Sequence, residues 1–163
     1  MSRRAVRRPP PALMQARVLE YASLPRSIPF AQDNSILVGA SGSPLQPLGR
    51  VPRVAICEES NGKLVLLFCD SGWRSLASVG QTSLRHAKSR VEMLYPGSSK
   101  RWVRAKVTKA RASGYLERVW AGHRCLFCLK LPFEHNESVF HQGRGRICGA
   151  CVAEFAREMS ETS

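Results

Sequence analysis

The sequence predicts an α+β fold: a small antiparallel sheet with one main helix, followed by a separate segment built on four cysteines. Three observations lead to this prediction. Two apolar runs flank Asn61-Gly62, residues 83–95 repeat apolar positions at helical spacing, and two C-x-x-C pairs lie near the C-terminal end. We divide the 163 residues into a disordered basic tail (1–12), a small α+β module (13–110), a connector (111–121) and a four-cysteine segment (122–160).

The first fifty residues carry the weakest structural pattern. Residues 1–12 are basic, contain three consecutive prolines and have no apolar periodicity, so we expect them to be disordered. Residues 14–21 fit either a short strand or a helical turn, and residues 35–38 predict a strand. Residues 40–49 are rich in glycine and proline, which predicts a loop.

A hairpin is predicted between residues 54–57 and 64–69, because Asn-Gly between two apolar runs is a strong signal for a two-residue turn. Such a turn would place Cys57 opposite Leu66 and Cys69 opposite Val54. The two cysteines would then lie on opposite faces of the sheet, unable to form a disulfide or share a metal. We therefore expect each of them to act as a small buried hydrophobic residue.

One helix and one further strand complete the predicted module. Thr82 is the predicted N-cap of a helix over residues 83–95, which Pro96-Gly97 ends. Its buried positions are Leu84, Ala87, Val91 and Leu94. Residues 102–109 alternate apolar and polar side chains, which predicts a strand with one basic, solvent-exposed face. The connector is expected to form one or two helical turns.

The two C-x-x-C pairs, Cys125 with Cys128 and Cys148 with Cys151, predict a four-thiolate metal site. Two cysteines three residues apart can both point into one turn. Two such pairs joined by a hairpin present a tetrahedron of sulfurs, which suits Zn²⁺. Val152, Phe155, Ala156 and Met159 follow at helical spacing. We therefore expect the second pair at a helix N-terminus, where thiolates are favoured.

The predicted ion is one structural zinc, because four protein ligands leave no open position for water or substrate. Iron remains an alternative, since thiolates bind both metals. A redox dithiol at residues 148–151 is a second alternative, but few residues follow to complete a thioredoxin-like framework. A disulfide scaffold is disfavoured, because nothing marks the chain as secreted. We expect His123, His135 and His141 to lie at the surface rather than to bind the metal.

The charge of the chain indicates an acidic partner. There are 25 Lys and Arg residues against 12 Asp and Glu, a formal net charge of +13. Nucleic acid, an anionic membrane surface and an acidic protein are the classes that such a charge attracts. No apolar run approaches the roughly eighteen residues that span a bilayer, so we expect no membrane partner. The cysteine usage without a secretion signal predicts a cytoplasmic protein.

No pattern in the sequence predicts an enzyme. The chain has no G-x-S-x-G elbow, no G-x-x-x-x-G-K-[ST] phosphate loop and no paired carboxylates suited to metal hydrolysis. We therefore expect a non-enzymatic protein.

The cysteine segment resembles a known family. The residues that carry the likeness are Cys125-Leu126-Phe127-Cys128, Val139-Phe140, Gly143, Ile147-Cys148 and Cys151-Val152. Together they resemble the N-terminal C4 zinc-binding domain of the ClpX chaperone, over about 38 C-terminal residues. Leu129 stands where that family usually has glycine, and Gly149-Ala150 replaces its usual acidic pair. The resemblance implies a treble-clef-like finger that binds zinc through the four cysteines, without the ATPase.

Fingers of this family dimerise and recognise adaptors or substrates, so the resemblance implies a zinc protein that mediates protein–protein contact. The expected partner-binding residues on the finger are Phe127, Val139 and Phe140. The alternative is a nucleic-acid-binding zinc protein, in which the basic surface around Arg101, Arg104 and Lys106 contacts phosphates.

Overall fold

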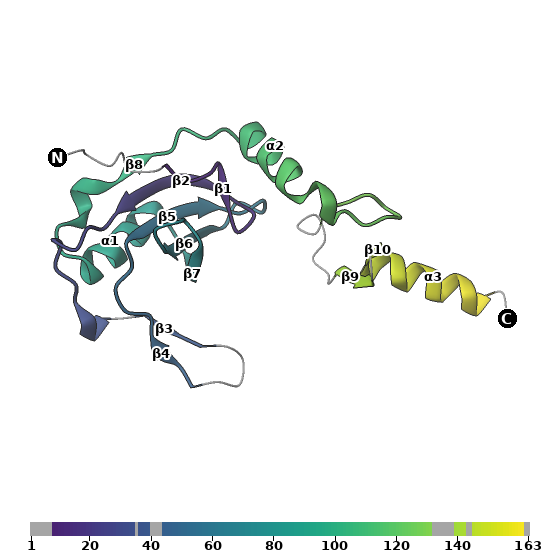
Figure 1. The fold of residues 1–163 in the computed structure, drawn as a ribbon, viewed down its shortest axis with the longest axis horizontal. Coiled ribbons are helices and arrows are strands. Elements are labelled where there is room, and N and C mark those ends of the chain that lie inside the picture. Colours follow the sequence, from purple (N-terminus) through teal and green to yellow (C-terminus); the bar gives the residue numbers. More distant parts are fainter. Residues whose placement is uncertain (1–7, 35, 40–43, 132–138, 143–144, 162–163) are drawn as a thin grey trace. The chain divides into compact units, whose positions relative to one another are not determined.

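The computed structural model describes residues 8–34, 36–39, 44–131, 139–142 and 145–161. The chain divides into two compact units, Met1–Ala112 and Ser113–Ser163, which are described separately (Figure 1). The predicted α+β class is confirmed. Residues 1–7 of the expected disordered tail, and Ser35 of the expected strand, lie outside the described residues.

The first unit is built on a six-stranded antiparallel sheet in the order β1-β2-β5-β6-β7, with β8 also paired to β2. The strands are β1 (Ala12–Leu13), β2 (Ala16–Ser23), β5 (Arg53–Glu58), β6 (Leu64–Cys69), β7 (Ser75–Gln81) and β8 (Val103–Arg104). A separate two-stranded ribbon pairs β3 (Leu37–Val38) with β4 (Gln46–Pro47). β3 lies in the strand predicted over residues 35–38, whereas β4 lies in the segment predicted as a loop. The helical elements are η1 (Gln32–Asn34), α1 (Leu84–Leu94) and η2 (Ser98–Arg101).

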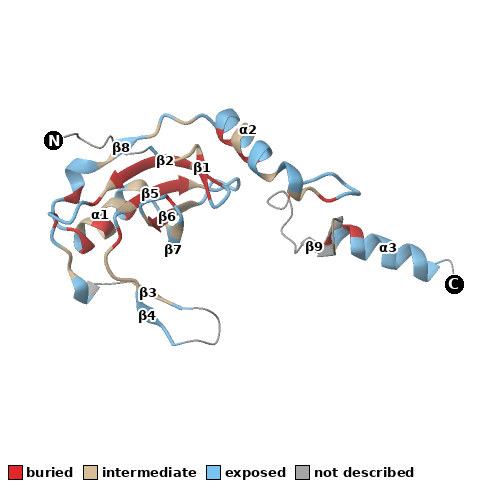
Figure 2. Cartoon of the chain, viewed as in Figure 1, coloured by how far each residue is buried: buried red, intermediate tan, exposed pale blue. Residues whose placement is uncertain are grey.

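The central strands are coloured as buried along much of their length in Figure 2, and their side chains are buried on both faces of the sheet. Val54 and Ile56 of β5 pack with α1, while Ala55 and Cys57 pack on the opposite face with Trp73. All four are fully buried. An antiparallel strand with one solvated face usually alternates apolar and polar residues. Strand β5 does not alternate in this way, and neither of its faces is solvated. One face of the sheet is covered by α1, and the other encloses a cluster formed by side chains of the strands themselves together with Trp73.

The hairpin between β5 and β6 forms as predicted, but its register differs by one residue. Glu59 N–H donates to Lys63 O at 2.9 Å and Gly62 N–H to Glu59 O at 3.0 Å. Gly62 has φ +82°. This is a three-residue loop whose last residue is left-handed, not a two-residue turn. Cys57 consequently pairs with Val65, and Cys69 with Arg53.

The shift in register overturns the prediction that Cys57 and Cys69 lie on opposite faces. Both belong to the cluster on the face away from α1, because a one-residue slip turns every side chain of a strand over. Both are fully buried and neither is in a disulfide, so their expected role as buried hydrophobic residues is confirmed. Burial raises the pKa of both thiols, that of Cys69 to about 12.

Helix α1 begins one residue later than predicted. Ser83 is the N-cap, and its side chain accepts a hydrogen bond from the backbone N–H of His86 at 3.1 Å. The hydroxyl of Thr82 instead lies 3.3 Å from Nδ1 of His86. Ala87, Val91 and Leu94 are buried as predicted, because they repeat at helical spacing on the face toward the sheet.

Two strands differ from their predictions. β7 was not predicted, since its sequence Ser-Leu-Ala-Ser-Val-Gly-Gln has few strand-favouring residues, and pairing with β6 determines its structure. The strand expected over residues 102–109 is reduced to β8, because Lys106 adopts a left-handed φ of +53° that ends the extended chain. Val103 of β8 is exposed.

The second unit contains most of α2 (Lys109–Trp120), η3 (Ala121–His123), the hairpin β9 (Val139–Gln142) and β10 (Gly145–Cys148), and α3 (Gly149–Glu161). The predicted connector is thus a helix longer than the expected one or two turns. β9 and β10 pair antiparallel, with Cys148 opposite Val139. α3 is exposed along almost its whole length beyond the first turn (Figure 2).

Candidate metal centre

The first cysteine pair lies in a tight turn that backbone hydrogen bonds close. Leu129 N–H donates to Cys125 O at 3.0 Å, and Cys125 N–H donates to Lys130 O at 3.0 Å. A further bond, from Leu126 N–H to Arg146 O at 2.9 Å, ties the turn to β10. Leu129 has φ +60°, a conformation that glycine adopts more readily. This is the position at which the resembling family usually has glycine.

The second cysteine pair spans the junction between a strand and a helix. Cys148 is the last residue of β10, and Cys151 lies in the first turn of α3. The backbone N–H of Cys148 donates to Sγ of Cys125 at 3.4 Å. The helix start expected for this pair is therefore confirmed, and the strand carries one sulfur while the helix carries the other.

The four sulfur atoms all lie within 4.8 Å of one another. Sγ of Cys125 and Sγ of Cys151 are 3.8 Å apart, as are those of Cys128 and Cys148. A disulfide requires about 2.05 Å, so these are separate thiols. Four sulfurs at about 2.3 Å from a central Zn²⁺ would be separated by about 3.8 Å in a regular tetrahedron. The spacing is therefore compatible with a metal ion.

The protonation of the cluster also favours a cation. Burial acts to raise the pKa of Cys125, but backbone N–H groups of Cys128, Cys148 and Phe127 donate to its sulfur and bring the pKa down to about 6. Burial and the neighbouring thiols raise the pKa of Cys151 to about 12. Without a cation, four crowded sulfurs do not all ionise at neutral pH, because like charges repel. A bound metal ion would remove that restriction.

In the described part of the second unit, the buried apolar side chains outside the cysteine cluster are those of Leu116 and Leu131. Cys125, Cys148 and Cys151 are buried together, and Ile147 packs against them. Cys128 is exposed. The buried centre of this unit therefore consists largely of the thiols themselves.

The outside of the metal centre is apolar. Leu126, Phe127 and Leu129, in or next to the first turn, are 61%, 59% and 62% exposed. Phe155 of α3 contacts Phe127 with ring centroids 4.8 Å apart and nearly perpendicular planes. Val152, Phe155 and Met159 of α3, which repeat at helical spacing, are all exposed.

The other predicted site residues fall in different places. Val139 and Phe140 lie in β9, but their side chains are outside the described residues, as are those of His135 and His141. The ring of His123 contacts that of Trp120 edge-on, with centroids 4.9 Å apart, and His123 is not in the cluster. Arg101, Arg104 and Lys106 are exposed on the first unit. The structure adds Arg85 of α1 to the exposed basic residues of the first unit, whereas Arg17 is half-buried and paired with Glu58.

Comparisons with protein-family models, curated proteins and solved structures gave no match to this chain. Among the described residues, no helix is both long and apolar enough to cross a membrane.

Proposed function

We propose that the chain is a non-enzymatic, cytoplasmic zinc protein whose C-terminal finger mediates protein–protein contact, including association with a second copy of itself. The observation that carries the proposal is the cluster of four thiols from two separate turns, with sulfur pairs 3.8 Å apart. Cysteine thiolates at this spacing suit Zn²⁺, and four protein ligands make the site structural. Thiolate ligands also call for a reducing compartment.

The arrangement of the finger supports a treble-clef-like, ClpX-type module. A turn carrying Cys125 and Cys128 is followed by a hairpin that ends at Cys148 and a helix whose first turn carries Cys151. The metal would supply most of the folding free energy of this unit, because its buried core is largely thiols. Roughly 10–16 kcal/mol of apparent binding free energy is typical of zinc-finger peptides.

The exposed apolar surface around the cluster supports a role in protein contact. Leu126, Phe127 and Phe155 come from the first turn and from α3, and the ring contact between the two phenylalanines joins the two elements. Continuous apolar surface of this kind marks interaction sites in soluble proteins.

A second copy is the occupant that we propose, because fingers of the resembling family dimerise and a second copy presents the same exposed apolar residues. α3 carries Glu154, Glu158 and Glu161 against Arg157. These carboxylates would have to lie outside the contact between the two copies, because like charges repel.

Metal content tests the first part of the proposal. Protein purified without added metal should contain one zinc per chain by elemental mass spectrometry, and Cys128→Ser should lose it. Cys69→Ala, which removes a thiol outside the cluster, should keep it. Stoichiometric iron, or equal zinc in wild type and Cys128→Ser, would show that the assignment is wrong.

Sedimentation velocity tests the second part. Zinc-loaded wild type should form a dimer as its concentration rises into the micromolar range, and Phe127→Ser should shift the equilibrium toward monomer. Leu45→Ser is the matched control, since Leu45 is an equally exposed apolar residue on the first unit. A zinc-loaded monomer at high micromolar concentration would refute self-association while leaving the zinc assignment intact.

A further inference from the structure

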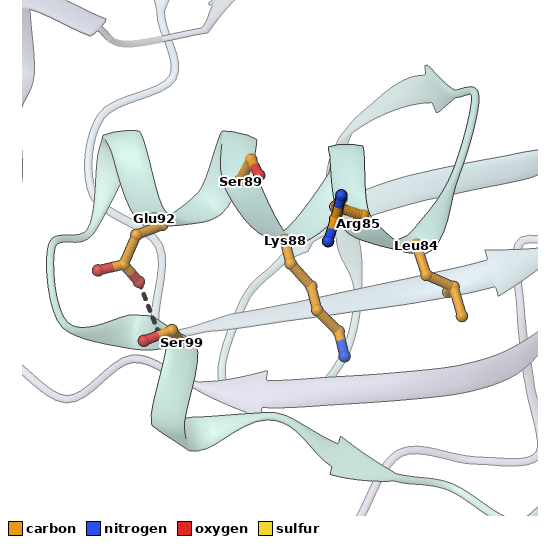
Figure 3. A pocket seen from close by; sticks show the side chains of 6 residues that line it. All are labelled: Leu84, Arg85, Lys88, Ser89, Glu92 and Ser99. Carbon is orange, nitrogen blue, oxygen red and sulfur yellow. Dashed lines mark hydrogen bonds between the residues drawn. The ribbon is translucent and has the colours of Figure 1, made fainter.

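Two hollows on the first unit meet at the start of α1, and Leu84 lines both of them. One runs along α1 to η2 and is lined by Arg85, Lys88 and Glu92, among others (Figure 3). The other is formed by β2, β8 and the residues after β8, and Arg17, Arg104 and Lys106 line it. Basic side chains therefore line a concave surface that continues across several elements.

The carboxylates in and beside these hollows already have partners. Glu92 accepts hydrogen bonds from the backbone N–H groups of Gly97 at 2.6 Å and Ser99 at 2.7 Å. Figure 3 shows it turned toward Ser99, away from Lys88. The pair formed by Lys88 and Glu20 measures 2.6 Å, and Arg17 pairs with Glu58 at 2.7 Å. The acidic groups are thus neutralised locally.

Three of the basic side chains keep their charge available. Arg85, Arg104 and Lys106 are exposed and form no ion pair within the described ranges. Arg17 does not belong to this set, because its guanidinium pairs with Glu58 and donates to the backbone oxygen of Val107, and its Nε is buried. The surface therefore carries an excess of cationic donors that internal contacts do not satisfy.

We propose that these hollows bind the phosphodiester backbone of a single nucleic-acid strand. Guanidinium and ammonium groups are the side chains that bind phosphate oxygens most strongly. The exposed basic side chains come from α1 and from the segment of β8 and the residues after it, and they line hollows that share Leu84, so an extended polyanion can contact them together. The net charge of +13 adds long-range attraction.

The binding has no sequence preference, because its contacts are to phosphates rather than to base edges. Neither hollow has an aromatic lining residue on which a base could stack. This activity lies on the first unit and does not depend on the proposed role of the finger.

The test uses the full-length, zinc-loaded chain and a fluorescein-labelled, mixed-sequence RNA of about 16 nucleotides. Fluorescence anisotropy measures the Kd for this RNA at several KCl concentrations between about 0.05 and 0.2 M. The variant Arg104→Gln/Lys106→Gln removes two basic groups from one hollow. Arg26→Gln/Lys63→Gln removes two exposed basic groups elsewhere on the same unit and has the same net charge. Circular dichroism confirms that each variant is folded, and Lys106→Gln alone replaces the double variant if it is not.

Each phosphate contact to a single strand contributes about 0.7 to the slope of log Kd against log salt. Loss of two contacts should therefore reduce the slope by about 1.4 and weaken binding roughly 25-fold at 0.1 M KCl. The control variant should bind like wild type. Equal weakening in both variants would show that net charge alone drives binding and would overturn the proposal. So would the absence of RNA binding, or binding only to vesicles of phosphatidylcholine and phosphatidylserine.

Discussion

Removal of the metal should expose four cysteines to alkylation and leave two protected. Cys125, Cys128, Cys148 and Cys151 form the cluster, whereas Cys57 and Cys69 are fully buried in the sheet of the other unit. Burial raises the pKa of Cys69 from its usual value near 9 to about 12. A pKa higher by about three units reduces the fraction of Cys69 present as thiolate at neutral pH roughly a thousandfold. Because the thiolate is the reactive species, Cys69 should react slowly with an alkylating agent.

N-ethylmaleimide labelling followed by intact mass spectrometry counts the modified thiols. Native zinc-loaded protein should acquire adducts slowly, since the metal holds the cluster thiolates. A strong chelator should produce a product with four adducts, and a further two should appear only in denaturant. Six adducts after chelation alone would refute the burial of Cys57 and Cys69. A product with fewer than four adducts after chelation would show that the cluster is not made of four metal-bound thiolates.

Three further predictions concern the first unit. Ser83→Ala should lower its free energy of unfolding by about 1 kcal/mol through loss of the cap of α1, whereas Thr82→Ala should change it little; denaturant titration measures both. Gly62→Ala should lower the free energy of unfolding by about 1–2 kcal/mol, because residue 62 has a φ of +82°, which alanine adopts at a cost. Gly80→Ala should not lower it, because a Cβ atom at residue 80 would meet no atom within 4 Å. Hydrogen bonds from the backbone N–H of Gly97 and from Ser98 hold the pKa of Glu92 below its usual range. The stabilisation by Glu92 is therefore present at neutral pH and is lost as the pH falls through the lowered pKa. Glu92→Gln should destabilise by no more than about 1 kcal/mol at pH 7, because the carboxylate is largely exposed, and the difference from wild type should vanish in acid. Equal stability curves at all pH values would contradict this.

The cluster of four thiols could be predicted because it depends on local chemistry. Two cysteines three residues apart converge in any tight turn or first helical turn, whatever the rest of the chain does. The same locality explains why α1 and the β5–β6 hairpin were predicted. Helical spacing and an Asn-Gly loop are both read within a dozen residues.

Features that depend on distant pairing could not be predicted in the same way. The choice between a two-residue and a three-residue loop at Asn61-Gly62 involves a single residue, yet it decides which face carries Cys57 and Cys69. β7 is a strand because β6 offers it a partner along its length. The hollow beside β8 is lined by residues that are far apart in the sequence, such as Arg17 and Lys106, so no local pattern could predict it.

The apolar run of α3 shows a different limit. Val152, Phe155 and Met159 repeat at helical spacing, which normally indicates a helix face that packs against a core. The spacing correctly predicts the helix, but it does not say what covers the apolar face. In this unit the described residues provide no core large enough to do so.

The two-sided burial of β5 and β6 has a consequence for hydrogen exchange. Backbone amides exchange with solvent when the structure around them opens. Opening β5 and β6 would expose the apolar clusters on both faces of the sheet at once, the one that contains Val54 and the one that contains Leu67. Their amides should therefore exchange only through global unfolding of the first unit. β7 and β8, at the borders of the sheet, can open alone, so exchange rates would rank the strands in order of distance from its centre.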